Sequence, residues 1–140
     1  MSKPKKITIA GSGLVGALHA IYMKRQGFDV DLYERRPDLR NNRISAGKSI
    51  NLALSDRGFR GLAGVGIEDD IRSISIPMYR RVMHDTKGNL TFQPYGKDGQ
   101  AIYSVSRGGL NCMLMDLAEA SGVKIHFNYN LLSVDLNSAR

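Results

Sequence analysis

The sequence predicts an α/β fold built on a parallel sheet, and features of its first 34 residues carry that prediction. An apolar run at 7–10 has the length of a buried strand. A glycine-rich turn, GSGLVG at 11–16, follows it, and residues 17–26 have the composition of a helix. A second strand is expected at 28–33, closed by Glu34. Strand, helix and strand in this order form a βαβ unit, whose two strands are parallel.

The three glycines of the turn have separate roles in a dinucleotide site. Gly11 forms the tight turn, Gly13 has no side chain to keep a pyrophosphate from the backbone, and Gly16 lets the helix pack closely on the strand. The N–H groups at the helix N-terminus can bind the phosphates. Glu34, about 20 residues further on, can accept hydrogen bonds from ribose hydroxyls. The pattern therefore predicts a bound dinucleotide.

Charged residues at the end of the second strand bear on which dinucleotide binds. Glu34 favours an unphosphorylated ribose, and hence FAD or NAD rather than NADP. Arg35 and Arg36 leave NADP as an alternative, because an arginine at this place can pair with a 2′-phosphate. Alternatively, both arginines are solvated surface charges.

The composition is that of a globular protein with a sizeable core. The chain has 140 residues, of which 42% are hydrophobic and 24% are charged. Its net charge of +7 suits anionic ligands, but aromatic residues are not interleaved with the basic ones as nucleic-acid binding requires. The single cysteine, Cys112, excludes an internal disulfide, and no His/Cys cluster suggests a metal. Without a signal-peptide pattern or a long apolar stretch, we expect a cytoplasmic protein with no membrane segment.

Short elements are expected in the middle of the chain. After a loop that begins at Arg35, the sequence predicts a short strand at 50–54, a helix over 57–63 with Ser55 as its N-cap, a helical turn at 68–73, and a β-hairpin from strands 76–83 and 90–93. Side chains alternate along a strand, so Arg81 is expected to face away from Arg80.

The last third of the chain predicts further alternation of strand and helix. The expected elements are a strand at 101–106, a helix of about 14 residues from Ser106 or Arg107, a strand at 123–127 that rejoins the parallel sheet, and a strand at 130–136. The helix has one apolar face, formed by Leu110, Met113, Leu114, Leu117 and Ala118. A dinucleotide fold needs more parallel strands than these. We therefore expect an incomplete fold, the N-terminal part of a longer enzyme.

Several sequence blocks resemble the flavoprotein aromatic hydroxylases, most closely those that act on kynurenine. The glycine turn is shared by many flavoproteins, and the other blocks are Tyr33-Glu-Arg-Arg36, Ser49-Ile-Asn-Leu-Ala-Leu-Ser55 with Arg57-Gly58, Val65-Gly-Ile67, Ile76-Pro-Met78, Pro94-Tyr-Gly96, and Tyr103-Ser-Val-Ser-Arg107 with Leu110-Asn111. The resemblance implies a Rossmann-like FAD-binding domain. Residues 1–70 and 101–140 would be mainly dinucleotide-binding, and 71–100 would be a β-hairpin excursion that belongs to the substrate domain.

The resemblance also implies binding residues. It places FAD against Gly11, Gly13, Val15, Gly16, Tyr33, Glu34, Arg35, Arg36, Ala53, Arg107 and Leu132. A guanidinium at Arg107, where a strand meets a helix, suits a pyrophosphate, although an arginine can also lie at a helix start without that role. Kynurenine's carboxylate would lie against Arg81 and Tyr95, which the sequence alone would leave as a surface arginine and a surface aromatic. His19, His84 and His126 show no acid partner and are interpreted as structural.

The implied reaction converts L-kynurenine to 3-hydroxykynurenine with NADPH and O2, in tryptophan catabolism and NAD biosynthesis. Since the flavin carries this chemistry, no catalytic side chain is expected. The family's later motifs, linked to NADPH and the ribityl chain, are absent, so we expect this chain to be inactive alone. Alternative interpretations are another FAD-dependent aromatic hydroxylase, an NAD-dependent dehydrogenase, or a non-catalytic dinucleotide-binding module.

Overall fold

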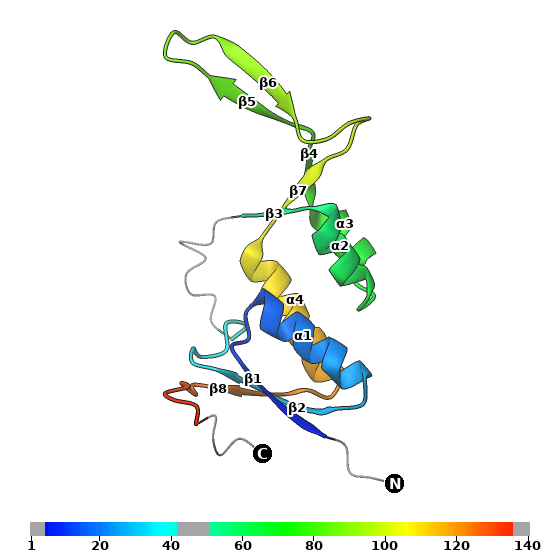
Figure 1. The fold of residues 1–140 in the computed structure, drawn as a ribbon, viewed down its shortest axis with the longest axis vertical. Helices are drawn as coiled ribbons and strands as arrows, with labels where there is room; N and C mark the ends of the chain where they lie inside the picture. The colour runs from blue at the N-terminus through cyan, green and yellow to red at the C-terminus, as the bar shows by residue number, and fades with distance from the viewer. Residues whose placement is uncertain (1–4, 42–50, 136–140) are drawn as a thin grey trace. The chain divides into compact units, whose positions relative to one another are not determined.

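The computed structural model describes residues 5–41 and 51–135. The chain forms two compact units, one of residues 1–46 and 111–140, the other of residues 47–110 (Figure 1). Each unit has its own sheet and its own buried side chains. The second unit is thus an insertion within the sequence of the first.

The first unit is built on a parallel sheet. Its strands β1 (Lys6–Ala10), β2 (Asp29–Glu34) and β8 (Lys124–Phe127) lie in the order β1-β2-β8, with Leu32 paired to both Ile9 and Ile125. Helix α1 (Leu14–Arg25) connects β1 to β2, and the end of helix α4 (Arg107–Ala120) leads into β8. Both predictions, the βαβ unit and the return of 123–127 to the parallel sheet, are confirmed.

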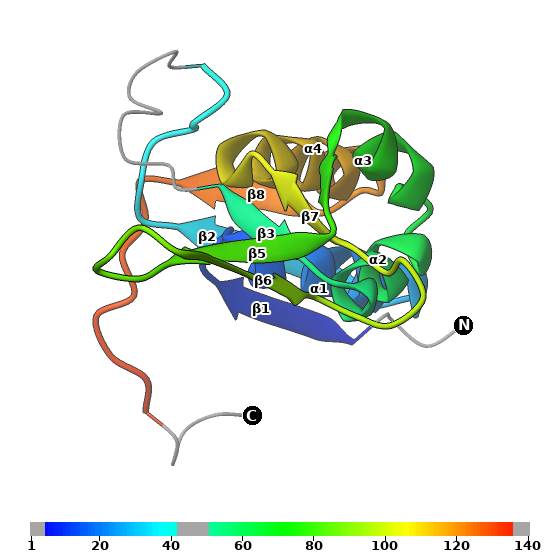
Figure 2. The ribbon, with the colours of Figure 1, turned by 90° about the horizontal axis from the view of Figure 1, so that it is seen from above.

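The core of the first unit lies between its sheet and the two helices, which cover the same face (Figures 1 and 2). Val30 and Leu32 are fully buried on β2. The helices contribute small and branched side chains, namely Ala17, Ala20 and Ile21 from α1 and Leu114, Met115 and Ala118 from α4. Small residues on α1 let its backbone approach the strands closely, as the glycine turn requires.

Arg40 fixes the loop after β2 to α4. Its guanidinium lies 2.7 Å from Asp38 Oδ2, 2.8 Å from Asp116 Oδ1 and 2.5 Å from Glu119 Oε2. The same group lies over the ring of Phe127, 5.7 Å from its centroid. Residues 35–41, the described part of the predicted loop, are therefore held to the first unit at Arg40.

The second unit is antiparallel. Strands β3 (Leu52–Leu54), β7 (Ile102–Val105) and β4 (Ile76–Met78) form one sheet in that order, and β5 (Arg80–His84) pairs with β6 (Leu90–Pro94) in a hairpin. Helices α2 (Asp56–Ala63) and α3 (Glu68–Ile74) lie between β3 and β4 in the sequence. Their buried side chains, with those of the strands, are Leu54, Phe59, Leu62, Val65, Ile67, Ile71 and Val105.

Two predicted strands differ in the structure. The strand expected at 76–83 is two strands, because the chain changes partner at Tyr79: β4 pairs with β7, and β5 pairs with β6. The strand expected at 130–136 is wrong for the described residues up to Asp135. Asn128, with φ of 64°, turns the chain out of the sheet directly after β8, and residues 129–135 are exposed.

No helix within residues 5–41 and 51–135 is long and apolar enough to cross a membrane.

Replacing Leu32 with alanine tests the core of the first unit. The side chain is 0% exposed on the central strand, so its loss leaves a cavity between sheet and helices. We expect the free energy of unfolding to fall by about 2–5 kcal/mol. Urea denaturation measures this, with Val134→Ala as control, since Val134 is 61% exposed. Equal losses in both variants would contradict the described core.

Candidate dinucleotide-binding site

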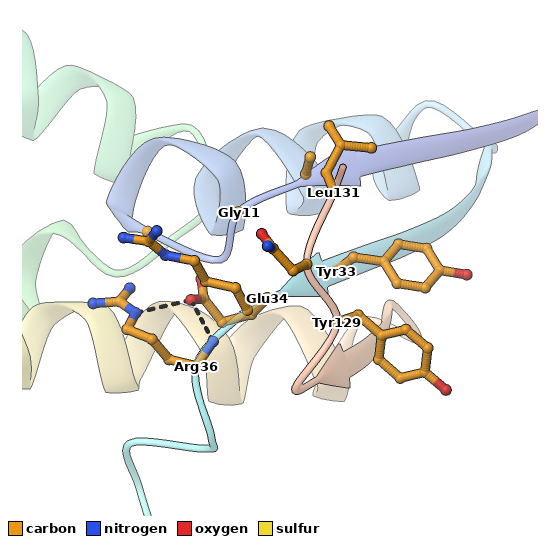
Figure 3. A pocket seen from close by; sticks show the side chains of 10 residues that line it. Gly11, Tyr33, Glu34, Arg36, Tyr129 and Leu131 are labelled. Atoms are coloured by element: carbon orange, nitrogen blue, oxygen red, sulfur yellow. Dashed lines mark hydrogen bonds and ion pairs between the residues drawn. The ribbon is translucent and has the colours of Figure 1, made fainter. Parts of the chain in front are cut away.

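A cavity of about 360 Å³ lies at the carboxyl edge of the parallel sheet. It is lined by Ala10, Gly11, Gly13, Tyr33, Glu34, Arg35, Arg36, Tyr129, Asn130 and Leu131 (Figure 3). These residues come from the turn after β1, the end of β2 and the segment after β8, so all three parallel strands end at the cavity. Open α/β sheets bind their ligands at this edge.

The glycine turn forms one wall of this cavity. Gly11 has a φ of 99°, and its N–H donates a hydrogen bond of 2.7 Å to the carbonyl of Tyr33. A Cβ at Gly16 would lie 1.9 Å from the Gly11 carbonyl oxygen, which excludes any side chain there. A Cβ at Gly13 would have no protein atom within 4 Å. The turn is therefore tightly packed at Gly16 and open at Gly13, where a ligand would approach the backbone.

Glu34 is a buried carboxylate beside this turn. Its Oε2 accepts hydrogen bonds from Ser12 N (2.9 Å) and Ser12 Oγ (3.3 Å), and its Oε1 accepts from Arg36 N (3.0 Å) and Arg36 Nε (2.8 Å). Burial raises the pKa of Glu34, but the hydrogen bonds from Arg36 and Ser12 outweigh it and lower the pKa to about 2. Arg36 is thus ion-paired with Glu34, while its side chain stays 51% exposed. Arg35 is exposed.

The segment after β8 forms another wall, and its lining residues Tyr129, Asn130 and Leu131 were not predicted, although the resemblance named the adjacent Leu132. Asn128 N–H donates to the Arg36 carbonyl (3.3 Å), and Tyr129 N–H donates to the Glu34 carbonyl (3.0 Å). These bonds hold Tyr129, Asn130 and Leu131 next to the end of β2, with the tyrosine rings pointing away from Glu34 (Figure 3). The available signal was topological, because a third parallel strand must end at the same edge as the first two.

The other predicted FAD contacts do not line this cavity. Val15, the second residue of α1, is 82% exposed, and Leu132 is 87% exposed directly after the lining residue Leu131. Ala53 on β3 and Arg107 at the start of α4 are exposed residues of the second unit. The first two residues of the resemblance block 49–55 lie outside the described residues.

The two predicted substrate residues lie on the β5–β6 hairpin and at its end. Arg81 pairs with Gln93 in the register, and its Nη2 donates a 2.5 Å hydrogen bond to Gln93 Oε1. Tyr95 follows Gln93 by two residues and lies directly after the end of β6. Its N–H donates to the Tyr79 carbonyl (3.0 Å). Arg80 lies on the other face with its guanidinium 4.9 Å from the Phe92 ring centroid, which confirms the predicted opposite facing of the two arginines.

A second buried carboxylate, Asp31, joins the three strands on the face away from the helices. Lys6 Nζ lies 2.8 Å from Asp31 Oδ2, and His126 Nε2 lies 2.7 Å from Asp31 Oδ1. The interpretation that His126 has no acid partner is therefore wrong. Its ring stacks on Tyr33 with centroids 4.5 Å apart. Hydrogen bonds from Lys6 and then His126 lower the pKa of Asp31 to about 2.

In the described part of the chain, no group of three or more His, Cys, Asp or Glu side chains is placed so that it could hold a metal ion.

Fold and site together define a Rossmann-like α/β fold with a candidate dinucleotide site. Residues 9–74 match the family model described as an NAD(P)-binding Rossmann-like domain. That range contains the glycine turn, α1 and β2, and the turn and the end of β2 supply most of the cavity lining.

Among curated proteins, the chain is similar to kynurenine 3-monooxygenases. That of Christiangramia forsetii is 48% identical over 140 residues, and that of Myxococcus xanthus is 47% identical over 142 residues, covering 100% and 99% of this chain. The enzyme of Anopheles gambiae is 44% identical over 96% of the chain. The predicted resemblance is thereby confirmed. The chain spans about a third of these relatives, 31%, 31% and 28% of their lengths.

Solved structures agree with the predicted fold class. The tetrameric form of 2-methyl-3-hydroxypyridine-5-carboxylic acid oxygenase matches with a TM-score of 0.75 and 27% identity, over 91% of this chain and 32% of that one. The p-nitrophenol 4-monooxygenase PnpA from Pseudomonas putida DLL-E4 matches with a TM-score of 0.72 and 18% identity, over 91% of this chain and 33% of that one, and shows the fold alone.

Acid unfolding tests the Asp31 cluster. Its pKa is about 2 in the folded state against 3.8 for an ordinary aspartate, so its contribution is present above about pH 4 and is lost as the pH falls from 4 to 2. We expect Asp31→Asn to lower the free energy of unfolding by about 2 kcal/mol at pH 7 and to flatten that loss. Urea denaturation at pH 7, 4 and 2.5 measures both. An unchanged pH slope in the variant would rule out the paired carboxylate.

Proposed function

We propose that this chain supplies the FAD-binding part of a monooxygenase that converts L-kynurenine to 3-hydroxykynurenine with NADPH and O2. The observation that carries the proposal is the open glycine turn beside Glu34 in a cavity at the sheet edge. The identity to kynurenine 3-monooxygenases along the whole chain supports the substrate and the reaction. A single cysteine, half-buried at Cys112, supports a reducing compartment, the cytoplasm.

The residues of the cavity fit FAD. Gly13 leaves free the space into which a Cβ would project, so a pyrophosphate can reach the N-terminus of α1. The buried negative charge of Glu34 favours a ribose with free hydroxyls over one that carries a 2′-phosphate. Arg36 pairs with Glu34, which leaves Arg35 as the free cation on the rim among the described lining residues.

Binding a ribose requires an exchange of partners at Glu34. A carboxylate offers about four lone-pair sites, and Ser12 and Arg36 already use all of them. The 3.3 Å contact from Ser12 Oγ is the longest of the four, and the Arg36 side chain is 51% exposed. A ribose hydroxyl therefore replaces one of these two side-chain donors, while the two backbone N–H bonds keep the carboxylate in place.

The remaining cofactor contacts follow from the resemblance. We assign Val15 and Leu132 to contacts next to the cavity, where both side chains are exposed. The resemblance also assigns Ala53 and Arg107 to the cofactor, Arg107 through its phosphates. When bound, the flavin supplies the redox chemistry with O2, so the chain's own task is to bind and orient it.

The β5–β6 hairpin supports a substrate carboxylate site. Arg81 pairs with Gln93 in the register, and Tyr95 follows Gln93 by two residues, directly after β6. A guanidinium and a phenol can together hold a carboxylate. Gln93 Oε1 is the present partner of Arg81 and is itself exposed, so a carboxylate can replace it.

Gly13→Val tests the cofactor assignment. Gly13 has φ −67° and ψ 177°, which valine adopts freely, and its Cβ would meet no protein atom. We therefore expect a folded protein that purifies without FAD, while the wild type purifies yellow. Flavin absorbance and the thermal unfolding midpoint are the measurements. A valine variant with full flavin content would refute the assignment.

Arg81→Ala tests the substrate assignment. We expect L-kynurenine affinity to fall about 10- to 150-fold, because a charge-assisted pair of roughly 1.5–3 kcal/mol is lost. Flavin content should be unchanged, and Arg81→Lys should recover only part of the affinity. Arg80→Ala is the matched control, since Arg80 stacks on Phe92 on the opposite face. Substrate titration of the whole protein, by flavin perturbation, gives the dissociation constants; a loss in the Arg80 variant alone would reverse the assignment.

A further inference from the structure

The hydroxyl of Ser12, in the glycine turn, lies between two possible acceptors. Its Oγ is 3.3 Å from Glu34 Oε2 and 3.5 Å from Met115 Sδ. A serine hydroxyl carries one hydrogen, so it donates fully to only one of these atoms at a time. Neither the resemblance nor the proposed function gives Met115 a role in binding the cofactor.

Both side chains of the Ser12–Met115 contact are buried. Ser12 and Met115 are each 1% exposed. Met115 belongs to α4 and lies 103 residues from Ser12 in sequence, so the contact exists because α4 packs beside the turn. A hydroxyl this deeply buried depends on protein acceptors, because leaving it without one costs free energy.

The carboxylate of Glu34 is the preferred acceptor when no ligand is bound. A charged carboxylate accepts more strongly than a thioether sulfur, which is a weak acceptor. The Ser12 hydroxyl is one of four donors that fill this carboxylate, with the N–H of Ser12 and two N–H groups of Arg36. The pKa of Glu34 is about 2, so the carboxylate is ionised at neutral pH.

Of the two side-chain donors that a ribose hydroxyl could displace, Ser12 is the easier to move. The contact from Arg36 Nε is charge-assisted and 2.8 Å long, and its loss would leave the charge of the buried Glu34 less compensated. The contact from Ser12 Oγ is longer than the usual O–H···O distance of about 2.7–2.8 Å. Ser12 also has a second acceptor, Met115 Sδ, already within reach.

Resting on the proposed function, we infer that Met115 is a positioning residue for the cofactor. Its sulfur accepts the Ser12 hydroxyl when a ribose hydroxyl replaces that hydroxyl on Glu34. Rotation of the O–H bond is enough for this exchange, because Oγ already lies within reach of both acceptors. The Ser12 N–H stays on Glu34 and keeps the turn in place. Met115 thus opens one lone pair of Glu34 to the ribose without touching the cofactor.

Met115→Leu removes the acceptor and nearly conserves the volume of the side chain. In the whole protein, after removal of its flavin, we expect FAD to bind about 3- to 10-fold more weakly, because the displaced hydroxyl has no acceptor. Met113→Leu is the matched control, since Met113 is half-buried on the same helix and should leave the dissociation constant unchanged. Titration with FAD, followed by flavin fluorescence, gives the constants.

Ser12→Ala separates the exchange from an effect on packing. Without the hydroxyl there is nothing to displace, so FAD should bind this variant at least as tightly as the wild type. In the Ser12→Ala background, Met115→Leu should cause no further loss. ADP, the part of FAD that carries this ribose, and 2′,3′-dideoxy-ADP, which lacks both ribose hydroxyls, localise the effect. Met115→Leu should weaken the first and leave the second unchanged.

The outcomes of these titrations are distinct. If Met115→Leu weakens FAD equally with and without the Ser12 hydroxyl, Met115 only packs against the turn, and the inference is overturned while the proposed function stands. The inference is also overturned if Met115→Leu has no effect on FAD. Ser12→Ala decides independently of whether the Met115 variant folds, since weaker binding of FAD by Ser12→Ala alone overturns the inference. If the wild type binds no FAD, the proposed function fails, and the inference fails with it.

Discussion

The hydrogen bond from the Ser12 N–H to the Glu34 carboxylate is the contact on which the candidate site depends. It joins the turn after β1 to the end of β2, across 22 residues of sequence. A buried charge is tolerated only when it is fully hydrogen-bonded, and here Ser12 and Arg36 supply the donors. The backbone carbonyl of Glu34 then accepts the N–H of Tyr129 and brings in the third strand end. One residue thereby positions all three walls of the cavity.

Strand β2 carries a buried carboxylate on each of its faces. Asp31 and Tyr33 point away from the helices, while Val30, Leu32 and Glu34 share the facing of the core. Asp31 pairs with one side chain from each neighbouring strand, Lys6 from β1 and His126 from β8, and so links the outer strands through the central one. Central strands of parallel sheets are buried on both faces, and this one uses charge pairs where most use apolar side chains.

Local pattern was enough to predict most of the fold. The glycine turn, the periodic helices and the strands at both ends of the βαβ unit follow from spacing and turn residues. Contacts between residues distant in sequence could not be predicted from local pattern. Asp31 and His126, for example, are 95 residues apart and meet only because β2 and β8 are neighbours. The predicted strand at 76–83 is divided at Tyr79 for a similar reason, because the tertiary fold decides which strand each part pairs with. Of the cavity, the sequence predicted the walls from the turn and β2 but not the wall after β8.

The described arginines fall into two groups, those paired with a carboxylate or an aromatic ring and those without such a partner. Those that serve the fold are paired or stacked, as Arg40 is with three acids and as Arg72 is with Glu68 and the ring of Phe59. Arg35, which lines the cavity, has no partner among the described residues. A guanidinium left free at a cavity stabilises no part of the fold by charge pairing. It is available to pair with an anion such as the phosphates of the proposed cofactor.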